Sequence, residues 1–184
     1  MTDNKNLYAD DDIISVNRLV RMRIPSLMIG LLLGILLSFV TSRFEDLLST
    51  NIRIAFFIPF VVYMADATGT QTQSIYARDL KSGHANFKKY LVKETLLGII
   101  LGIISSLVIA VIVSVWFSSI DLTLAVSLAT FGAIACAPLI ALLVTHFFKL
   151  EHSDPAVGAG PIATVIQDTV SVLIFGLIAS WIVL

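Results

Sequence analysis

Two aspartates interrupt apolar stretches of the sequence. Asp168 lies thirteen residues after the start of the apolar segment 155–184, and Asp66 directly follows the apolar run 54–65. A carboxylate at the centre of a bilayer costs about 2.5–3.5 kcal/mol on insertion scales. No Lys or Arg falls at a comparable depth in an apolar segment, so an ion pair within the chain is not expected. We interpret Asp168 as lining a wet pathway for cations; the alternative is a protonated side chain bonded to a neighbouring helix.

The helical period of the last segment adds small and polar residues to the face of Asp168. Steps of three or four give one stripe about 25 Å long at 1.5 Å per residue. Its members are Asp154, Gly158, Pro161, Thr164, Asp168 and Ser171. Such a face can also serve close helix packing. Packing does not explain two carboxylates, so we expect Pro161 and Ser171 to line a pore.

A run of polar residues follows Asp66. At membrane depth such a run is tolerated only against protein or water. We expect Pro59 to bend this helix and Gly69 to permit an irregular backbone whose carbonyls face an ion, with Thr68 and Gln71 on the pore. The alternative is that the helix has reached the cytosolic interface, where water solvates the run.

Carboxylates, carbonyls and water are the ligands of hard divalent cations. Mg²⁺ gives up its waters reluctantly, so it often meets a protein through one or two carboxylates. Rings of carboxylates filter cations in channels. One aspartate per chain forms a ring only if chains associate.

Other candidates are weaker. We expect Glu94 to pair with Lys93 or Arg78, with a contribution to an entry site as the alternative. His146 and His152 flank the inner end of the fourth apolar segment, and we interpret them as interfacial, with a metal site or a pH sensor as the alternative. No Ser/His/Asp arrangement, nucleotide-binding glycine loop or HExxH motif occurs, so the chain is not expected to be an enzyme.

The composition indicates that membrane helices hold these residues. Of 184 residues, 57% are hydrophobic and 14% are charged, against about 45–50% and 25% in soluble domains. A soluble enzyme and a disordered chain are thereby excluded. The net charge of −1 comes without a continuous basic face, so nucleic acid is not an expected partner. The single cysteine, Cys136, excludes an intrachain disulfide.

Five apolar segments predict five spans in one domain. They cover residues 25–41, 52–75, 90–117, 122–148 and 155–184. Ten of the twelve Lys and Arg fall on one side, which places the N-terminus in the cytosol and the C-terminus outside. Pro25 is expected to start the first span, where its missing N–H costs nothing. Residues 1–24 are then a cytosolic arm, which either ends in an amphipathic helix on the membrane surface or extends the first span.

Several short segments together resemble the membrane domain of the MgtE family of magnesium channels and transporters. They are Arg43-Phe44-Glu45, Phe57-Ile58-Pro59, Gly69-Thr70-Gln71, Asp154-Pro155-Ala156, and Gly160-Pro161 with Asp168. Their order and spacing match over residues 20–184. The resemblance implies a five-helix pore domain over residues 25–184 in the cell membrane. It also implies a homodimer with a central pore lined by the second and fifth spans.

The resemblance further assigns roles to residues. The family's mid-pore aspartate falls on Asp168, which both chains contribute to hold hydrated Mg²⁺. Its aspartate at the cytosolic start of the fifth span falls on Asp154. Two positions that shape the ion site fall on Thr164 and Gly160. The backbone of the second span near the selectivity region falls between Ala65 and Gly69.

Two departures from the family pattern change the expected behaviour. Family members of the bacterial type carry large cytosolic domains that sense Mg²⁺ and close the channel, whereas about 24 residues precede the first span here. We expect that gating route to be absent unless a separate regulatory chain supplies it. The family's usual Gly-Gly-Asn reads Ala65-Asp66-Ala67. The added carboxylate could shift selectivity toward Ca²⁺ or Mn²⁺, or permit coupling to Na⁺ or H⁺.

We therefore predict an all-α integral membrane protein that forms a homodimer and conducts or transports divalent cations, with Mg²⁺ as the default ion. Asp168 and Asp66 hold the hydrated ion, Asp154 marks the cytosolic vestibule, and no organic cofactor is expected. One alternative is a non-transporting scaffold or regulatory subunit. The other is a Na⁺- or H⁺-coupled carrier for a small organic solute, with Asp168 as the protonatable relay.

Overall fold

The computed structural model describes residues 14–150 and 155–184. Every regular element in this part of the chain is helical. The elements are α1 (Val16–Ser42), α2 (Glu45–Thr50), the 3₁₀ helix η2 (Ile52–Phe57), α3 (Ile58–Lys81), α4 (Phe87–Phe117), α5 (Ile120–Leu150) and α6 (Pro155–Val183). Five helical segments are long and apolar enough to cross a membrane, which confirms the expected all-α, multi-pass membrane fold.

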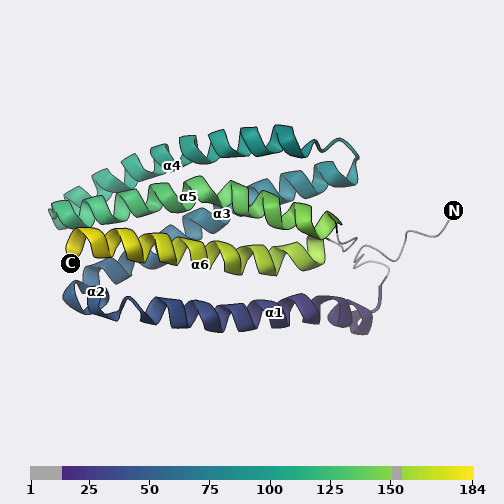
Figure 1. Cartoon of the computed structure of the whole chain (residues 1–184), viewed down its shortest axis with the longest axis horizontal. Coiled ribbons are helices and arrows are strands. Elements are labelled where there is room, and N and C mark those ends of the chain that lie inside the picture. The colour runs from purple at the N-terminus through teal and green to yellow at the C-terminus, as the bar shows by residue number, and fades with distance from the viewer. Residues whose placement is uncertain (1–13, 151–154) are drawn as a thin grey trace.

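The long helices run side by side in one elongated bundle (Figure 1). Helix α5 is at its centre and packs against α3, α4 and α6. Helix α4 packs mainly on α5, and α1 packs on α6, so these two helices form the outer sides of the bundle. Helices α3 and α6 also contact each other, which brings together the two helices that carry the unusual aspartates.

Small residues allow the central helix to be surrounded so closely. One face of α5 carries a buried alanine at every fourth position: Ala125, Ala129, Ala133, Ala137 and Ala141. This face meets α3, where Gly69 approaches Ala137 and Ala141; on another face of α5, Gly98 and Gly102 of α4 approach Phe131 and Ala135. A Cβ built at Gly98 would lie 2.6 Å from the carbonyl oxygen of Ala135. Small residues at helix contacts are typical of membrane bundles, where close backbone approach replaces a hydrophobic driving force.

The outer helices expose large apolar side chains. Leu31 and Leu32 on α1, and Leu107 and Val111 on α4, are each more than half exposed. An apolar surface of this extent marks an interaction site or a membrane contact. On helices of spanning length, lipid is the partner that satisfies it.

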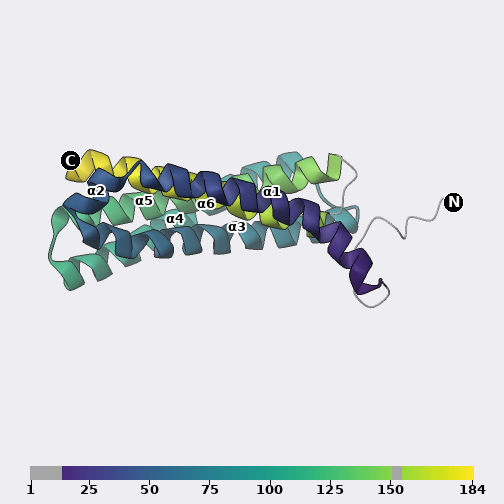
Figure 2. The same cartoon turned by 90° about the horizontal axis from the view of Figure 1, so that it is seen from below.

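The expectations for two prolines were wrong. Pro25 does not begin the first span but lies inside α1, which already starts at Val16. The N-terminal turns of α1 bend away from the bundle (Figure 2), as a proline within a helix produces. The described part of the arm thus extends the first span. Pro59 occupies the first turn of α3 and begins this helix instead of bending it, because no helical N–H is lost at that position.

The irregular backbone expected at Gly69 is also absent from the described structure. Helix α3 is continuous from Ile58 to Lys81. Gly69 instead marks a close approach to α5, where an added Cβ would lie 3.4 Å from the carbonyl oxygen of Ala137. Two side chains of the polar run find partners within this regular helix bundle: the Thr68 hydroxyl donates to the carbonyl oxygen of Met64 at 2.8 Å, and the Thr72 hydroxyl donates to Glu94 at 2.7 Å.

Candidate cation site

The two aspartates singled out by the sequence come together between α3 and α6. Asp66 and Asp168 are close enough for their charges to interact. One carboxylate oxygen of Asp168, Oδ1, is buried and has no hydrogen-bond partner among the described residues. Within the same part of the chain, neither carboxylate forms an ion pair with Lys or Arg. The site thus holds two acidic groups that the surrounding helices do not neutralise.

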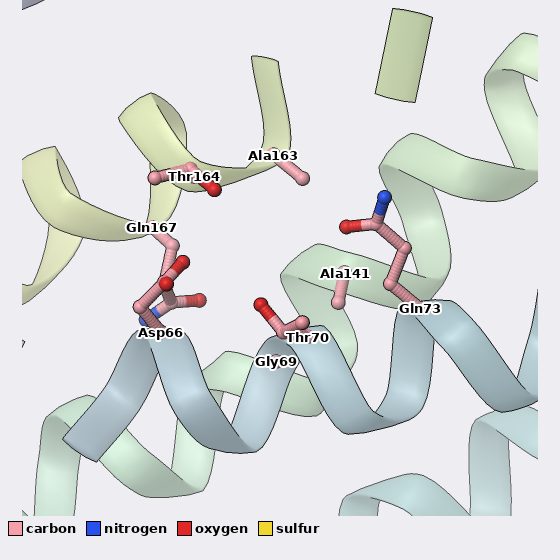
Figure 3. A pocket seen from close by; sticks show the side chains of 8 residues that line it. All are labelled: Asp66, Gly69, Thr70, Gln73, Ala141, Ala163, Thr164 and Gln167. Atoms are coloured by element: carbon pink, nitrogen blue, oxygen red, sulfur yellow. The ribbon is translucent and has the colours of Figure 1, made fainter. Parts of the chain in front are cut away.

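A small cavity adjoins Asp66 where α3, α5 and α6 meet (Figure 3). It measures about 10 Å³, counted as the space open to the centre of a water molecule, which is close to the least that one water needs. The side chains with oxygen atoms come from α3 and α6, and the other lining residues are glycine and alanine. The lining residues are Asp66, Gly69, Thr70, Gln73, Ala141, Ala163, Thr164 and Gln167.

Helical periodicity explains why these side chains share one cavity. On α3, steps of three or four residues place Asp66, Thr70 and Gln73 on one face. On α6, Thr164 and Gln167 are three residues apart and face them. Gly160 lies one turn earlier on α6 and leaves room for Gln73, whose Nε2 would lie 3.6 Å from an added Cβ.

The structure brings together part of the predicted site. Asp66, Gly69 and Thr164 line the cavity, and Gly160 borders Gln73. Asp168 interacts with Asp66 but does not line the cavity.

Other predicted residues lie elsewhere. Ala65 and Thr68 are buried on the side of α3 that packs on the core, whereas the Gln71 side chain is exposed. Ser171 is fully buried and hydrogen-bonded to Gln167. Asp154 lies outside the described residues. Pro161 lies within α6, but its side chain is outside the described part.

Sequence reasoning missed Gln167, Thr70 and Gln73. Gln167 stands directly before Asp168 and is the second polar side chain at that depth of the last apolar segment. That position was the available signal. It was overlooked because the small-residue stripe passes through Asp168, whereas Gln167 belongs to the neighbouring row that faces α3 and α5.

A second group of polar side chains connects the C-terminal half of α3 to α4 and α5. The expected pairing of Glu94 with Lys93 or Arg78 is wrong, because Glu94 accepts a hydrogen bond from Thr72 while Arg78 pairs with Asp79 at 3.1 Å. Hydrogen bonds between side chains of the described residues join this half of α3 to its neighbours. They join Thr72 Oγ1 to Glu94 at 2.7 Å, Tyr76 Oη to His146 Nδ1 at 2.7 Å, and Tyr90 Oη to Asp79.

Replacing Thr72 by valine should destabilise the bundle. Thr72 is nearly fully buried, and its loss leaves the Glu94 carboxylate without this donor. A hydrogen bond to a charged group contributes about 1.5–3 kcal/mol. Thr130→Val is the matched control, because within the described structure the buried Thr130 hydroxyl donates to the carbonyl oxygen of Val126 in its own helix and to no other helix. Thermal unfolding in detergent should show a clearly larger loss for Thr72→Val; equal losses would contradict a specific role for the Glu94 bond.

The fold and the site define the class: a multi-pass membrane protein whose bundle places acidic side chains between two of its helices. The chain belongs to the MgtE family of divalent cation transporters, which it matches over residues 58–178.

Two curated relatives are similar over most of this chain. The magnesium transporter MgtE of Enterococcus faecalis is 32% identical over 161 residues, which cover 86% of this chain and 36% of that protein. The magnesium transporter MgtE of Bacillus subtilis is 29% identical over 156 residues, which cover 83% of this chain and 35% of that protein. The chain thus spans about a third of the length of these relatives.

Proposed function

We propose that this protein carries divalent cations, with Mg²⁺ as the default ion, across the cell membrane along a pathway lined by α3 and α6. One observation carries the proposal: among the described residues the buried Oδ1 of Asp168 has no hydrogen-bond partner, and the charge that acts on this carboxylate is the like charge of Asp66. Two carboxylates without a cationic neighbour in a membrane bundle need a cation from outside. Membership of a family of divalent cation transporters supports this assignment.

The proposed mechanism uses the carboxylates as outer-sphere partners. Hydrated Mg²⁺ donates hydrogen bonds from its waters to Asp168 and Asp66, so the ion is held without losing its hydration shell. Because few direct bonds form, the ion can also leave, as conduction requires. In this proposal Asp154 marks the cytosolic vestibule, the N-terminus lies in the cytosol and the C-terminus lies outside.

The remaining predicted residues take supporting roles in the proposal. Gly160 and Thr164 shape the ion site on α6, and the backbone between Ala65 and Gly69 borders it on α3. Side chains further along the two helices line the path. They are Thr68, Gln71, Pro161 and Ser171.

We further propose that the working unit is a homodimer. Thr70, Gln71 and Ser74 are exposed on α3 in the single chain, and polar side chains at membrane depth need protein or water beside them. A second copy would cover this face and bring two Asp66 and two Asp168 to one axis. Native mass spectrometry of the protein released from lipid nanodiscs should give a mass of two chains. A monomer that still transports would contradict the dimer.

Flux into proteoliposomes tests the function itself. Mg²⁺, Ca²⁺, Mn²⁺ and Co²⁺ are compared with and without Na⁺ and proton gradients. We expect saturable Mg²⁺ flux that the other divalent ions compete for. Folded protein that shows no flux under any gradient would overturn the proposal and favour a non-transporting scaffold subunit.

A further inference from the structure

We propose that the cavity between α3, α5 and α6 is a binding site for one Na⁺ ion within each protomer, beside the path of the hydrated divalent ion, with which it shares Asp66 and Thr164. Its ligands are the carboxylate of Asp66, the amide oxygen of Gln167 and the hydroxyls of Thr70 and Thr164. The binding site is argued from the cavity alone. Its consequence, that Na⁺ changes Mg²⁺ transport, rests on the proposed function.

The first step is the orientation of the Gln167 amide. Gln167 is 3% exposed. The Ser171 hydroxyl donates its only proton to the carbonyl oxygen of Gln167 at 2.8 Å, so toward the Gln167 side chain it can only accept. The Nε2 group of Gln167 must therefore face Ser171, at 3.2 Å. The amide oxygen Oε1 is left on the other side, buried and without a partner among the described residues.

This unpaired oxygen belongs to a side chain that lines the cavity. Gln167 lies beside Asp66 in Figure 3, with Thr70 on the same face of α3 and Thr164 on α6. A buried acceptor without a donor lowers the stability of the folded state by about 1–3 kcal/mol. The cavity therefore favours a bound group that donates hydrogen bonds or carries positive charge. Two hydroxyls and a carboxylate complete a ligand set made of oxygen atoms.

The charge of the site favours a cation over water. A water molecule could donate to Gln167 Oε1, but it would leave the negative charge of Asp66 uncompensated. Asp66 also interacts with the charge of Asp168. Holding two half-buried carboxylates together within a membrane bundle is costly unless a positive charge is added. A cation next to Asp66 would coordinate the unpaired amide oxygen of Gln167 and reduce the repulsion between Asp66 and Asp168.

The size of the cavity decides which cation fits. About 10 Å³ of free space admits one water-sized particle, which excludes Mg²⁺ with its hydration shell. Bare Mg²⁺ requires octahedral ligands and loses its waters reluctantly. The free-energy cost of dehydration is much smaller for a monovalent ion, because the solvation free energy grows with the square of the charge. Membrane transporters hold Na⁺ with carbonyl oxygens and side-chain oxygens of this kind.

The test measures stability in the absence of divalent ions. Wild-type protein in nanodiscs with EDTA is titrated with NaCl, KCl or choline chloride at equal ionic strength, and the thermal midpoint is followed. We expect a saturable rise with Na⁺ and none with choline, since a ligand that binds only the folded state stabilises it. Equal responses to all three salts would overturn the proposal and leave the cavity to water.

Variants assign the effect to the cavity. Gln167→Met keeps the length of the side chain but removes the amide oxygen, and should weaken the apparent Na⁺ affinity at least about tenfold. Gln167→Glu keeps an oxygen at the cavity and should retain the Na⁺ response. Thr130→Val lies outside the cavity and should respond as wild type. Thr70→Val, on an exposed position, should also weaken Na⁺ binding and serves if Gln167→Met does not fold. An unchanged Na⁺ response in both Gln167→Met and Thr70→Val would overturn the site.

Mg²⁺ flux in the same preparation separates the two proposals. Saturable Mg²⁺ flux without any Na⁺ effect on stability means that the Na⁺ site is wrong and the transport function stands. A Na⁺ effect on stability without Mg²⁺ flux means that the Na⁺ site stands and the transport function is wrong.

Discussion

Mg²⁺ flux should fall by about 100-fold or more when Asp168 is replaced by asparagine, because a charge-assisted interaction of about 1.5–3 kcal/mol is lost in each copy. The substitution preserves the shape of the side chain, and the buried Oδ1 already lacks a hydrogen-bond partner among the residues that the structure describes. It therefore removes the charge with little change in packing. Removing the repulsion from Asp66 should leave the thermal midpoint unchanged or higher. Flux into proteoliposomes and the unfolding midpoint are measured on the same sample.

Asp121→Asn provides the matched control. Asp121 is an exposed carboxylate in the first turn of α5, and the same chemical change there should leave flux at the wild-type level. Wild-type flux in Asp168→Asn would refute the central role of this carboxylate. A loss of flux in both variants would point to a general effect of surface charge at the membrane.

The number and nature of the spans could be predicted from the sequence because each depends on local composition. A helix of spanning length needs about 20 apolar residues whatever its neighbours are. Prolines were harder to interpret, since Pro25 lies within a helix and Pro59 begins one. The effect of a proline depends on whether the chain before it is already helical, and that is decided by packing several turns away.

The candidate site could be predicted only in part, for a related reason. Asp66 and Asp168 stand out because a charge in an apolar segment is conspicuous by itself. Gln167 does not, because its meaning depends on the hydrogen bonds of Ser171 and on the cavity beside Asp66. Gly69 was interpreted as a break in the helix, yet its role is a contact with α5. A single sequence does not distinguish these two uses of glycine.

The packing of α4 on α5 leads to a large expected loss of stability from Gly98→Ala. An added Cβ at Gly98 would lie 2.6 Å from the carbonyl oxygen of Ala135 and 3.2 Å from the ring of Pro138. Backbone and a proline ring cannot rotate aside, so α4 must move away from α5. Overpacking of this kind costs about 1–3 kcal/mol. The thermal midpoint in detergent should fall clearly, and Mg²⁺ flux should fall only as far as folded protein is lost.

Gly34→Ala separates this packing effect from the general effect of glycine in a helix. In the part of the chain that the structure describes, no group beyond the backbone of α1 itself lies within 4 Å of a Cβ at Gly34. Alanine in a helix is more favourable than glycine by about 0.5–1 kcal/mol, so this variant should unfold at the wild-type temperature or slightly above it. The two substitutions are chemically identical and differ only in what the new methyl group meets. A fall of the same size in both variants would contradict the close contact between α4 and α5 at Gly98. This contact bears on the cation cavity because α5 also contributes Ala141 to the cavity lining.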